Sequence, residues 1–326
     1  MVLRLMEIYG VSDKKEVIEE LINNIIIHGI WQESLPHEKV VTRILLDAEQ
    51  IELLLEIFEK KYSEKKDFRI IVLPVEASIP RPEKEDIKKD KDKTPRRVCI
   101  EELYEHVIED VSISSTFFIL IILASIVASI GILYDNVAVI IGSMVIAPLL
   151  GSSMALSLAT TLADKKLAKD ALIISTSGYT IAIVIGLFFG IIFTINPSSA
   201  EILSRTDINL MYILLAFASG IAGAISFIKD VSQSLVGVMV AVALLPPLVV
   251  TGLLIGSQNW SQALGSFLLF SVNIVCINLA AVITFLSYGM TPKKWWEKEK
   301  AKRMTITALI LWITLLLVLV ILIVFF

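Results

Sequence analysis

The chain has 326 residues, of which 56% are hydrophobic and 19% charged, and the charges gather at one end: residues 1–110 hold 18 Lys/Arg and 25 Asp/Glu, whereas residues 111–326 hold 11 and 8. A soluble domain needs far more charge on its surface, so the C-terminal part is predicted to lie in a membrane, behind an acidic soluble domain. Two distant cysteines, Cys99 and Cys276, exclude a disulfide-rich secreted protein, and the lack of a basic stripe argues against nucleic-acid binding.

Residues 1–79 are predicted to form a small α+β domain. Alternating or β-branched runs indicate strands at 3–9, 30–35, 39–47 and 68–75, and apolar residues at helical spacing indicate helices at 12–29 and 48–61. The resulting β-α-β-β-α-β order is that of a ferredoxin-like domain. Because the N-terminus lacks the apolar core of a signal peptide, we expect this domain to stay in the cytoplasm.

A charged linker and a short amphipathic helix follow the soluble domain. Residues 80–97 contain three prolines and mixed charge, and cannot bury enough apolar surface to fold alone. Residues 98–111 place apolar side chains on one helical face and acidic ones opposite, which indicates a helix along the inner membrane surface or against the bundle. Its acidic face argues against strong binding to anionic lipid.

Residues 112–326 are predicted to form a transmembrane domain, since each apolar run is near or above the roughly 20 residues that cross a bilayer. The loops at 164–170 and 290–303 are rich in lysine, whereas the loops on the opposite side hold a single basic residue, Arg205. The positive-inside rule therefore predicts a multi-pass protein of the cell (inner) membrane, with its N-terminus cytoplasmic and its C-terminus outside. Seven spans are expected, at 117–133, 137–163, 171–195, 210–228, 231–256, 263–288 and 304–326.

Two groups of three spans share an internal sequence repeat. The pattern Asp135-x6-Gly142 returns as Asp230-x6-Gly237 with the same spacing. We therefore predict a first repeat at 117–195 and a second at 210–288, with the last span outside the repeat. Because three spans are an odd number, the second copy must insert upside down, which gives the 3+3 inverted architecture of many secondary transporters.

The middle span of each repeat contains proline, which removes a backbone donor and disturbs the preceding turn. Freed carbonyl groups cannot persist in lipid, so breaks of this kind must face protein or a water-filled cavity. We expect the two breaks to meet near mid-membrane and form the binding site; the alternative is a pair of kinks that pack against neighbouring helices without a ligand. The candidate substrate-binding residues are Ser143, Pro148, Gly151, Ser152, Ser153, Pro246, Pro247 and Thr251.

Other polar residues in the spans admit two interpretations. Asp135 and Asp230 fall at predicted helix ends, where they either cap helices or act as gating carboxylates at the two mouths. Asn273 and Asn278 are expected to form hydrogen bonds between helices, and Ser175–Gly178 to line the same cavity. Gly186-x3-Gly190 indicates a close helix contact. No metal site or cofactor is predicted.

The chain resembles the prokaryotic membrane proteins catalogued as domain of unknown function 389. The resemblance depends on NVAVIIGSMVIAPLLG at 136–151 and GVMVAVALLPPL at 237–248, and it covers roughly residues 110–290. It implies a bacterial or archaeal cell membrane and supplies no catalytic residues.

We interpret the chain as a transporter or channel-like permeation protein for a small solute or ion, surrounded by membrane lipid. A non-transporting scaffold or sensor, whose cytoplasmic domain binds a ligand or partner, is the alternative. An enzyme is not expected, because all three histidines precede residue 107, no phosphate-binding loop is present, and Asp135 and Asp230 fall on opposite sides. A homo-oligomer is among the expected assemblies.

The charge bias makes the orientation testable. In a variant without its natural cysteines, a cysteine placed at Ser199 should react with an impermeant maleimide in intact cells. A cysteine at Lys298 should react only after permeabilisation. Labelling at Lys298 in intact cells would reverse the predicted topology.

Overall fold

The structure is a computed structural model, and it describes residues 3–9, 25, 27–35, 39–62, 68–75, 77–78, 103–104, 107–108, 111, 114–207, 210–229, 233–290 and 295–325. The chain divides into two compact units, Met1–Glu102 and Leu103–Phe326. The expected helix that begins at Ser12, the linker at 80–97 and Asp230 lie outside the described residues. Of the expected helix at 98–111, Leu103, Val107 and Val111 are described and buried.

The first unit contains a four-stranded antiparallel sheet in the order β2-β3-β1-β4. Its strands are β1 (Leu3–Tyr9), β2 (Ile27–Leu35), β3 (Lys39–Asp47) and β4 (Arg69–Val75), close to the ranges predicted from sequence. The hairpin strand β3 lies between β1 and β2, as in a split βαβ unit. The small antiparallel sheet is confirmed; the ferredoxin-like pattern stays a prediction, because its first helix is not described.

One face of this sheet packs against helix α2 (Ile51–Tyr62), which follows the 3-10 turn η1 (Ala48–Gln50). Residues in β1 alternate between buried and partly buried, so that Met6 and Ile8 point to the same side. Helix α2 places Leu54 and Phe58, both fully buried, against that side. The strand period of two and the helical period of 3.6 thus converge on a single small core.

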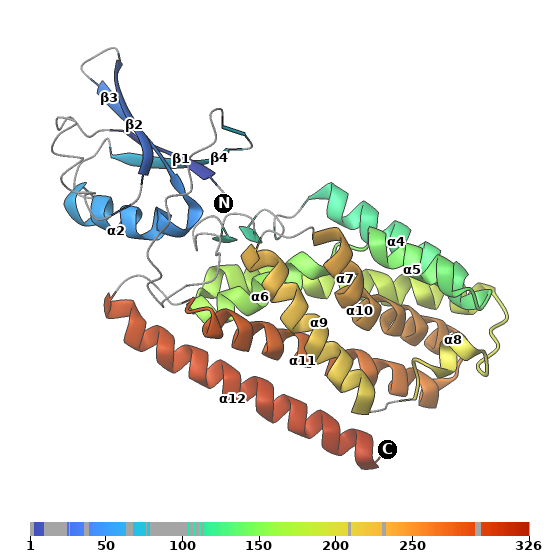
Figure 1. Ribbon diagram of the computed structural model, residues 1–326. Helices are drawn as coiled ribbons and strands as arrows, with labels where there is room; N and C mark the ends of the chain where they lie inside the picture. Colours follow the sequence, from blue (N-terminus) through green and yellow to red (C-terminus); the bar gives the residue numbers. More distant parts are fainter. Residues whose placement is uncertain are drawn as a thin grey trace. The chain divides into compact units, whose positions relative to one another are not determined.

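The second unit is an all-helical bundle (Figure 1). Six of its helices are long and apolar enough to cross a membrane, and the bent pair α5–α6 would count as a seventh. The helices are α4 (Ser115–Leu133), α5 (Val137–Ile146), α6 (Leu149–Leu162), α7 (Lys165–Ile192), the short α8 (Ala200–Leu203), α9 (Leu210–Lys229), α10 (Gln233–Gly256), α11 (Trp260–Ser287) and α12 (Trp295–Phe325).

The helix boundaries recur along the chain. Helices α7 and α11 begin and end 95 residues apart, and α4 and α9 begin 95 residues apart. The same interval separates Asp135 from Asp230 in the sequence motif. The equal spacing supports the predicted repeat, while the inverted relation between its two halves remains a prediction.

The helices of the bundle differ in the share of their apolar residues that is buried. In α10 and α11, 78% of the apolar window is buried, compared with 6% in α12. Helix α12 lies along the edge of the bundle in Figure 1, and the hydroxyl of Thr305 bonds there to the carbonyls of Thr160 and Thr161 at the end of α6. This peripheral position agrees with the expectation that the last span is an addition to the repeat.

The closest helix contact joins α7 to α10 through two glycine pairs. A Cβ atom built at Gly186 would lie 2.4 Å from the Val249 carbonyl oxygen, and one at Gly190 would lie 2.3 Å from that of Leu253. On the other helix, a Cβ at Gly252 would lie 2.2 Å from the Ile183 carbonyl oxygen. One turn further, a Cβ at Gly256 would lie 2.5 Å from the Leu187 carbonyl oxygen. The predicted Gly186-x3-Gly190 contact is confirmed, and its partner is a second Gly-x3-Gly pair.

We predict that Gly252→Ala destabilises the bundle. The new methyl group would meet backbone atoms that cannot rotate away, so α7 and α10 must separate, at a cost of about 1–3 kcal/mol. Thermal unfolding in detergent measures the change. Gly142→Ala is the matched control, because a Cβ there meets nothing within 4 Å and alanine favours a helix by about 1 kcal/mol over glycine. An equal melting temperature for Gly252→Ala and the wild type would contradict the contact.

Asp164 closes the turn between α6 and α7. Its Oδ1 atom accepts from the backbone N–H groups of Lys166 and Leu167, and its Oδ2 atom accepts from the Tyr104 hydroxyl. Partial burial raises the pKa of this carboxyl, but the three hydrogen bonds outweigh that effect and hold the pKa below its usual value. The charged form therefore stabilises the fold above the unfolded pKa, and this stabilisation is lost as the pH falls through the folded pKa.

Asp164→Asn should flatten the pH dependence of stability. Asparagine still caps the helix, but it has no carboxyl group to protonate. Between about pH 5 and pH 3 the wild type should lose more melting temperature than the variant, because the ordinary pKa is about 3.9. Tyr104→Phe, which keeps the carboxylate and removes one donor, should fall between them. Parallel curves for all three proteins would show that Asp164 makes no such contribution.

Candidate functional site

The helical structure is interrupted between α5 and α6, and the two helices meet at an angle of 53°. Pro148 has no N–H group for the ladder, and Ala147 leaves the helix with extended dihedrals (φ −73°, ψ 118°). The Ala147 N–H still bonds to the Ser143 carbonyl, whereas that of Leu149 bonds only to Ala147. The break predicted at Pro148 is therefore confirmed, and it gives α6 an N-terminus inside the bundle.

Protein surrounds this break on several sides. A Cβ at Gly178 of α7 would lie 3.8 Å from Leu149. Gly223 of α9 and Gly237 of α10 both face the side chain of Leu150. Glycines from three helices thus make room for the first residues of α6. The side chains that follow the break thus face other helices, where freed backbone groups need partners because hydrocarbon offers none.

The hydroxyl groups near the break are buried and bond to nearby carbonyls. Ser143 donates to the Ile140 carbonyl at 2.6 Å, and Ser152 and Ser153 both donate to Leu149. One turn further, Ser157 donates to the amide oxygen of Asn278 at 2.9 Å. Gly151, in the first turn of α6, is only partly buried. Each serine keeps lone pairs that a bound group could use.

The second predicted break is wrong, because α10 continues as a helix through Pro246 and Pro247. Pro247 cannot donate to the Ala243 carbonyl, and the Asn273 amide donates to that oxygen instead, at 2.8 Å. The Pro247 carbonyl accepts from Thr251 at 2.7 Å and from Ser266 at 2.8 Å. Side chains of α11 thus supply donors along the proline segment, and the helix needs no break.

The two proline sites lie at different depths. Leu149 is opposite Gly178, and Val249 is opposite Gly186, eight residues further along α7. A helix rises 1.5 Å per residue, so Leu149 and Val249 contact α7 at points about 12 Å apart along its axis. These contacts do not support the expectation that both prolines meet at a single point, which stays a prediction. Ser143, Ser152 and Ser153 belong to the Pro148 site, whereas Thr251 belongs to the Pro246–Pro247 site.

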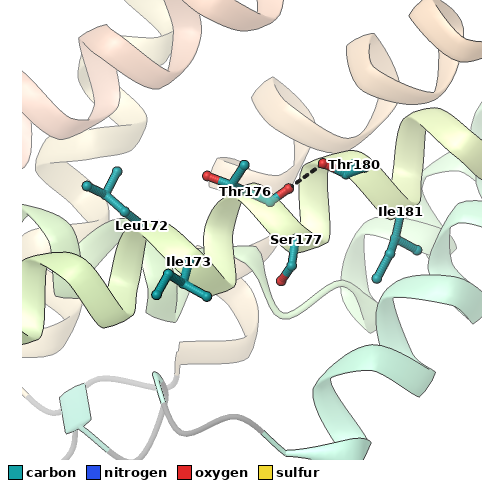
Figure 2. Close-up of a pocket in the computed structure, with 6 residues that line it drawn as sticks. All are labelled: Leu172, Ile173, Thr176, Ser177, Thr180 and Ile181. Atoms are coloured by element: carbon teal, nitrogen blue, oxygen red, sulfur yellow. Dashed lines mark hydrogen bonds between the residues drawn. The ribbon is translucent and has the colours of Figure 1, made fainter.

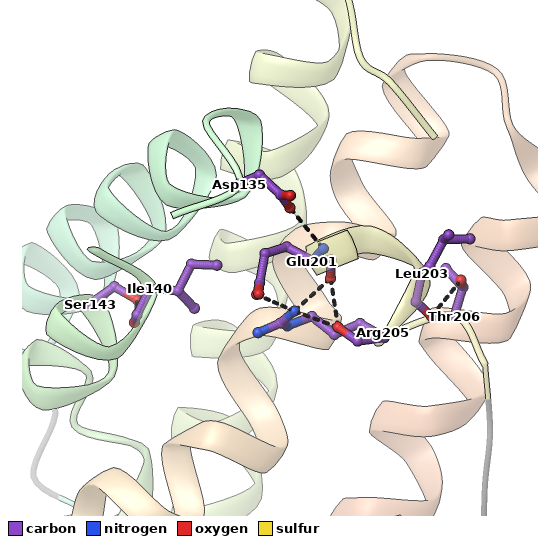
Figure 3. Close-up of polar contacts among 8 residues, drawn as sticks. Asp135, Ile140, Ser143, Glu201, Leu203, Arg205 and Thr206 are labelled. Carbon is purple, nitrogen blue, oxygen red and sulfur yellow. Dashed lines mark hydrogen bonds and ion pairs between the residues drawn. The ribbon is translucent and has the colours of Figure 1, made fainter. Parts of the chain in front are cut away.

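Asp135 fastens a distant loop to the turn between α4 and α5 (Figure 3). It adopts a left-handed conformation (φ 52°), and its Oδ1 atom accepts from the Glu201 backbone N–H of α8 at 2.9 Å. Glu201 forms an ion pair with Arg205, and both side chains are largely buried. Of the two expected roles, this contact is of the capping kind, although the helix capped is α8.

A hollow of about 620 Å³ lies along one face of α7 (Figure 2). It is lined by Leu172, Ile173, Thr176, Ser177, Thr180 and Ile181, all from the same helix. The Ser177 and Thr180 hydroxyls bond to carbonyls of their own helix. Thr176 and Ser177 thus line this outer hollow, whereas Ser175 and Gly178 are buried. The sequence predicts that Ser175–Gly178 lines a single cavity. In the structure these residues instead face two different sides of α7.

Sequence reasoning missed Tyr179, whose ring packs edge-on against Phe270 with ring centroids 4.9 Å apart. Its position directly after the hydroxyl-rich stretch of α7 was the available signal. Within the parts of the chain that the structure describes, no group of three or more His, Cys, Asp or Glu residues could hold a metal ion.

Comparison with known proteins gives two matches. A family model described as domain of unknown function (DUF389) matches residues 144–279, which include both proline sites. An uncharacterised protein of Methanocaldococcus jannaschii is 38% identical over 259 residues, covering 79% of this chain and 80% of the relative. No solved structure matches the chain.

Proposed function

The chain belongs to the family described as domain of unknown function DUF389, and from that premise we propose that it is a permeation protein for a small solute or ion. The pathway passes the break at Pro148. The proposal places the protein in a cell membrane with a cytoplasmic N-terminus, includes no chemical conversion of the solute, and assigns no cofactor.

The observation that carries the proposal is the 53° break between α5 and α6, which places the first turn of the buried helix α6 inside the bundle. Interrupted helices direct backbone N–H and carbonyl groups at ligands near the middle of transporter folds. The helix boundaries that recur at 95 residues support an origin from two related halves, the arrangement in which such breaks occur. Ser143, Ser152 and Ser153 supply further polar atoms at the same place.

A scaffold or sensor without transport is the second candidate. The serine hydroxyls at the break already bond to carbonyls, and α10 and α11 are extensively buried. A bundle of this kind needs no solute to complete it. On this alternative the soluble unit would carry the binding function.

Flux through reconstituted vesicles separates the two candidates. Stopped-flow light scattering after osmotic jumps with NaCl, KCl, urea or glycerol should show faster permeation of at least one probe than in protein-free vesicles. Gly151→Leu should reduce this permeation more than tenfold, because the larger side chain enters the space beside the break. Gly142→Leu is the matched control, since nothing lies within 4 Å of its Cβ position.

Equal permeation in protein-containing and protein-free vesicles for all four probes would favour the scaffold. Equal inhibition by Gly142→Leu and Gly151→Leu would remove the pathway from the Pro148 break.

A further inference from the structure

In helices α7 and α11, three buried side-chain atoms have no hydrogen-bond partner within the described part of the chain. They are the Ser175 and Tyr179 hydroxyl oxygens on α7 and the Asn273 amide oxygen on α11. Ser175 is 3% exposed and Asn273 is 4% exposed. An unpartnered buried polar group costs about 1–3 kcal/mol, so three in one bundle call for an occupant.

These atoms lie near the middle of the membrane-spanning helices. Tyr179 and Asn273 each stand at the midpoint of a 28-residue helix. The Tyr179 ring contacts Phe270, which is one turn from Asn273 on α11. The Tyr179 hydroxyl lies close enough to the hydroxyls of Ser175 and of Ser153 on α6 to interact with them, although these contacts fall short of full hydrogen-bond geometry. The cluster therefore joins α6, α7 and α11 at similar depth.

The amide of Asn273 has a fixed orientation. Its nitrogen donates to the Ala243 carbonyl, which Pro247 cannot serve. Only the nitrogen of the amide can donate to this carbonyl, so the amide oxygen lies on the other side of the amide group, away from the Ala243 carbonyl. The proline in α10 thus sets the direction in which Asn273 offers its oxygen.

The uncharged oxygens of the cluster, and the lack of charged side chains around it, indicate which class of ligand it binds. All three open atoms are uncharged oxygens, and no Asp, Glu, Lys, Arg or His occurs in residues 171–195 or 233–288 of the sequence. Without a cationic side chain an anion finds no counter-charge, and without a carboxylate a divalent cation lacks its usual ligands. Neutral oxygens are the ligands that bind dehydrated monovalent cations in membrane proteins.

We propose that Ser175, Tyr179 and Asn273 form a mid-membrane binding site for a monovalent alkali cation such as Na⁺ or K⁺. The inference deepens the proposed function, because it names the class of ion that the permeation pathway would carry or use for coupling. In this proposal the two hydroxyl oxygens and the amide oxygen would each offer lone pairs to the ion.

Binding to the detergent-purified full chain tests the site separately from transport. Melting temperatures are measured in NaCl, KCl and choline chloride at equal ionic strength, and isothermal titration with NaCl and KCl gives the affinity. One alkali cation should raise the melting temperature above that in choline. Tyr179→Phe and Ser175→Ala should each weaken its affinity at least tenfold while the protein still unfolds cooperatively.

Ser177→Ala and Thr180→Val are the matched controls, because these hydroxyls lie on the outer face of α7 and bond within the helix. Both should bind the cation like the wild type. Identical melting in all three salts, or equal losses in test and control variants, would overturn the site and leave water as its occupant. Permeation of urea or glycerol would then still support the proposed function, whereas cation binding without any flux would support the site and overturn the proposed function.

Discussion

The contact between α7 and α10 constrains the position of the other helices that pack against α10. Four glycines let the two backbones approach so closely that carbonyl oxygens of one helix occupy the space that a Cβ atom would need on the other. In a lipid environment, where apolar surfaces gain little from avoiding solvent, close packing of this kind is a principal source of helix association. It fixes α10 against α7, and α10 in turn packs against α11 and faces the break at Leu150.

The helix is interrupted at Pro148 and continues through Pro246 and Pro247, and one pair of positions contributes to this difference. Gly178 and Asn273 stand 95 residues apart, the interval at which the helix boundaries recur. Asn273 gives α10 a donor for the carbonyl that Pro247 leaves unpaired, so the helix continues. Gly178 has no side chain to donate, and its small volume admits Leu149 and Phe117 beside the bent segment. The second repeat thus has a donor at a position where the first has only a small side chain.

Much of the architecture could be predicted from sequence because its causes are local. Apolar runs predicted the spans, and proline predicted the break at residue 148. The patterns of apolar and β-branched residues predicted the bounds of strands β1 and β3 almost to the residue. The continuity of α10 could not be predicted, because its donors come from Asn273 and Ser266, which are distant in the chain. The contact between Asp135 and α8 could not be predicted for the same reason, because 66 residues separate the two partners. Side chains that replace backbone donors across helices leave no periodic signal.

Helix α12 has 31 residues and, at 1.5 Å per residue, a length of about 46 Å. This exceeds the roughly 30 Å of bilayer hydrocarbon, and its first nine residues hold all of its charges, so the apolar remainder alone matches the membrane. Because so little of it is buried in the bundle, natural selection acts on its hydropathy far more than on the identity of its side chains. Among relatives this helix should drift freely between leucine, isoleucine and valine, while the four glycines of α7 and α10 stay fixed.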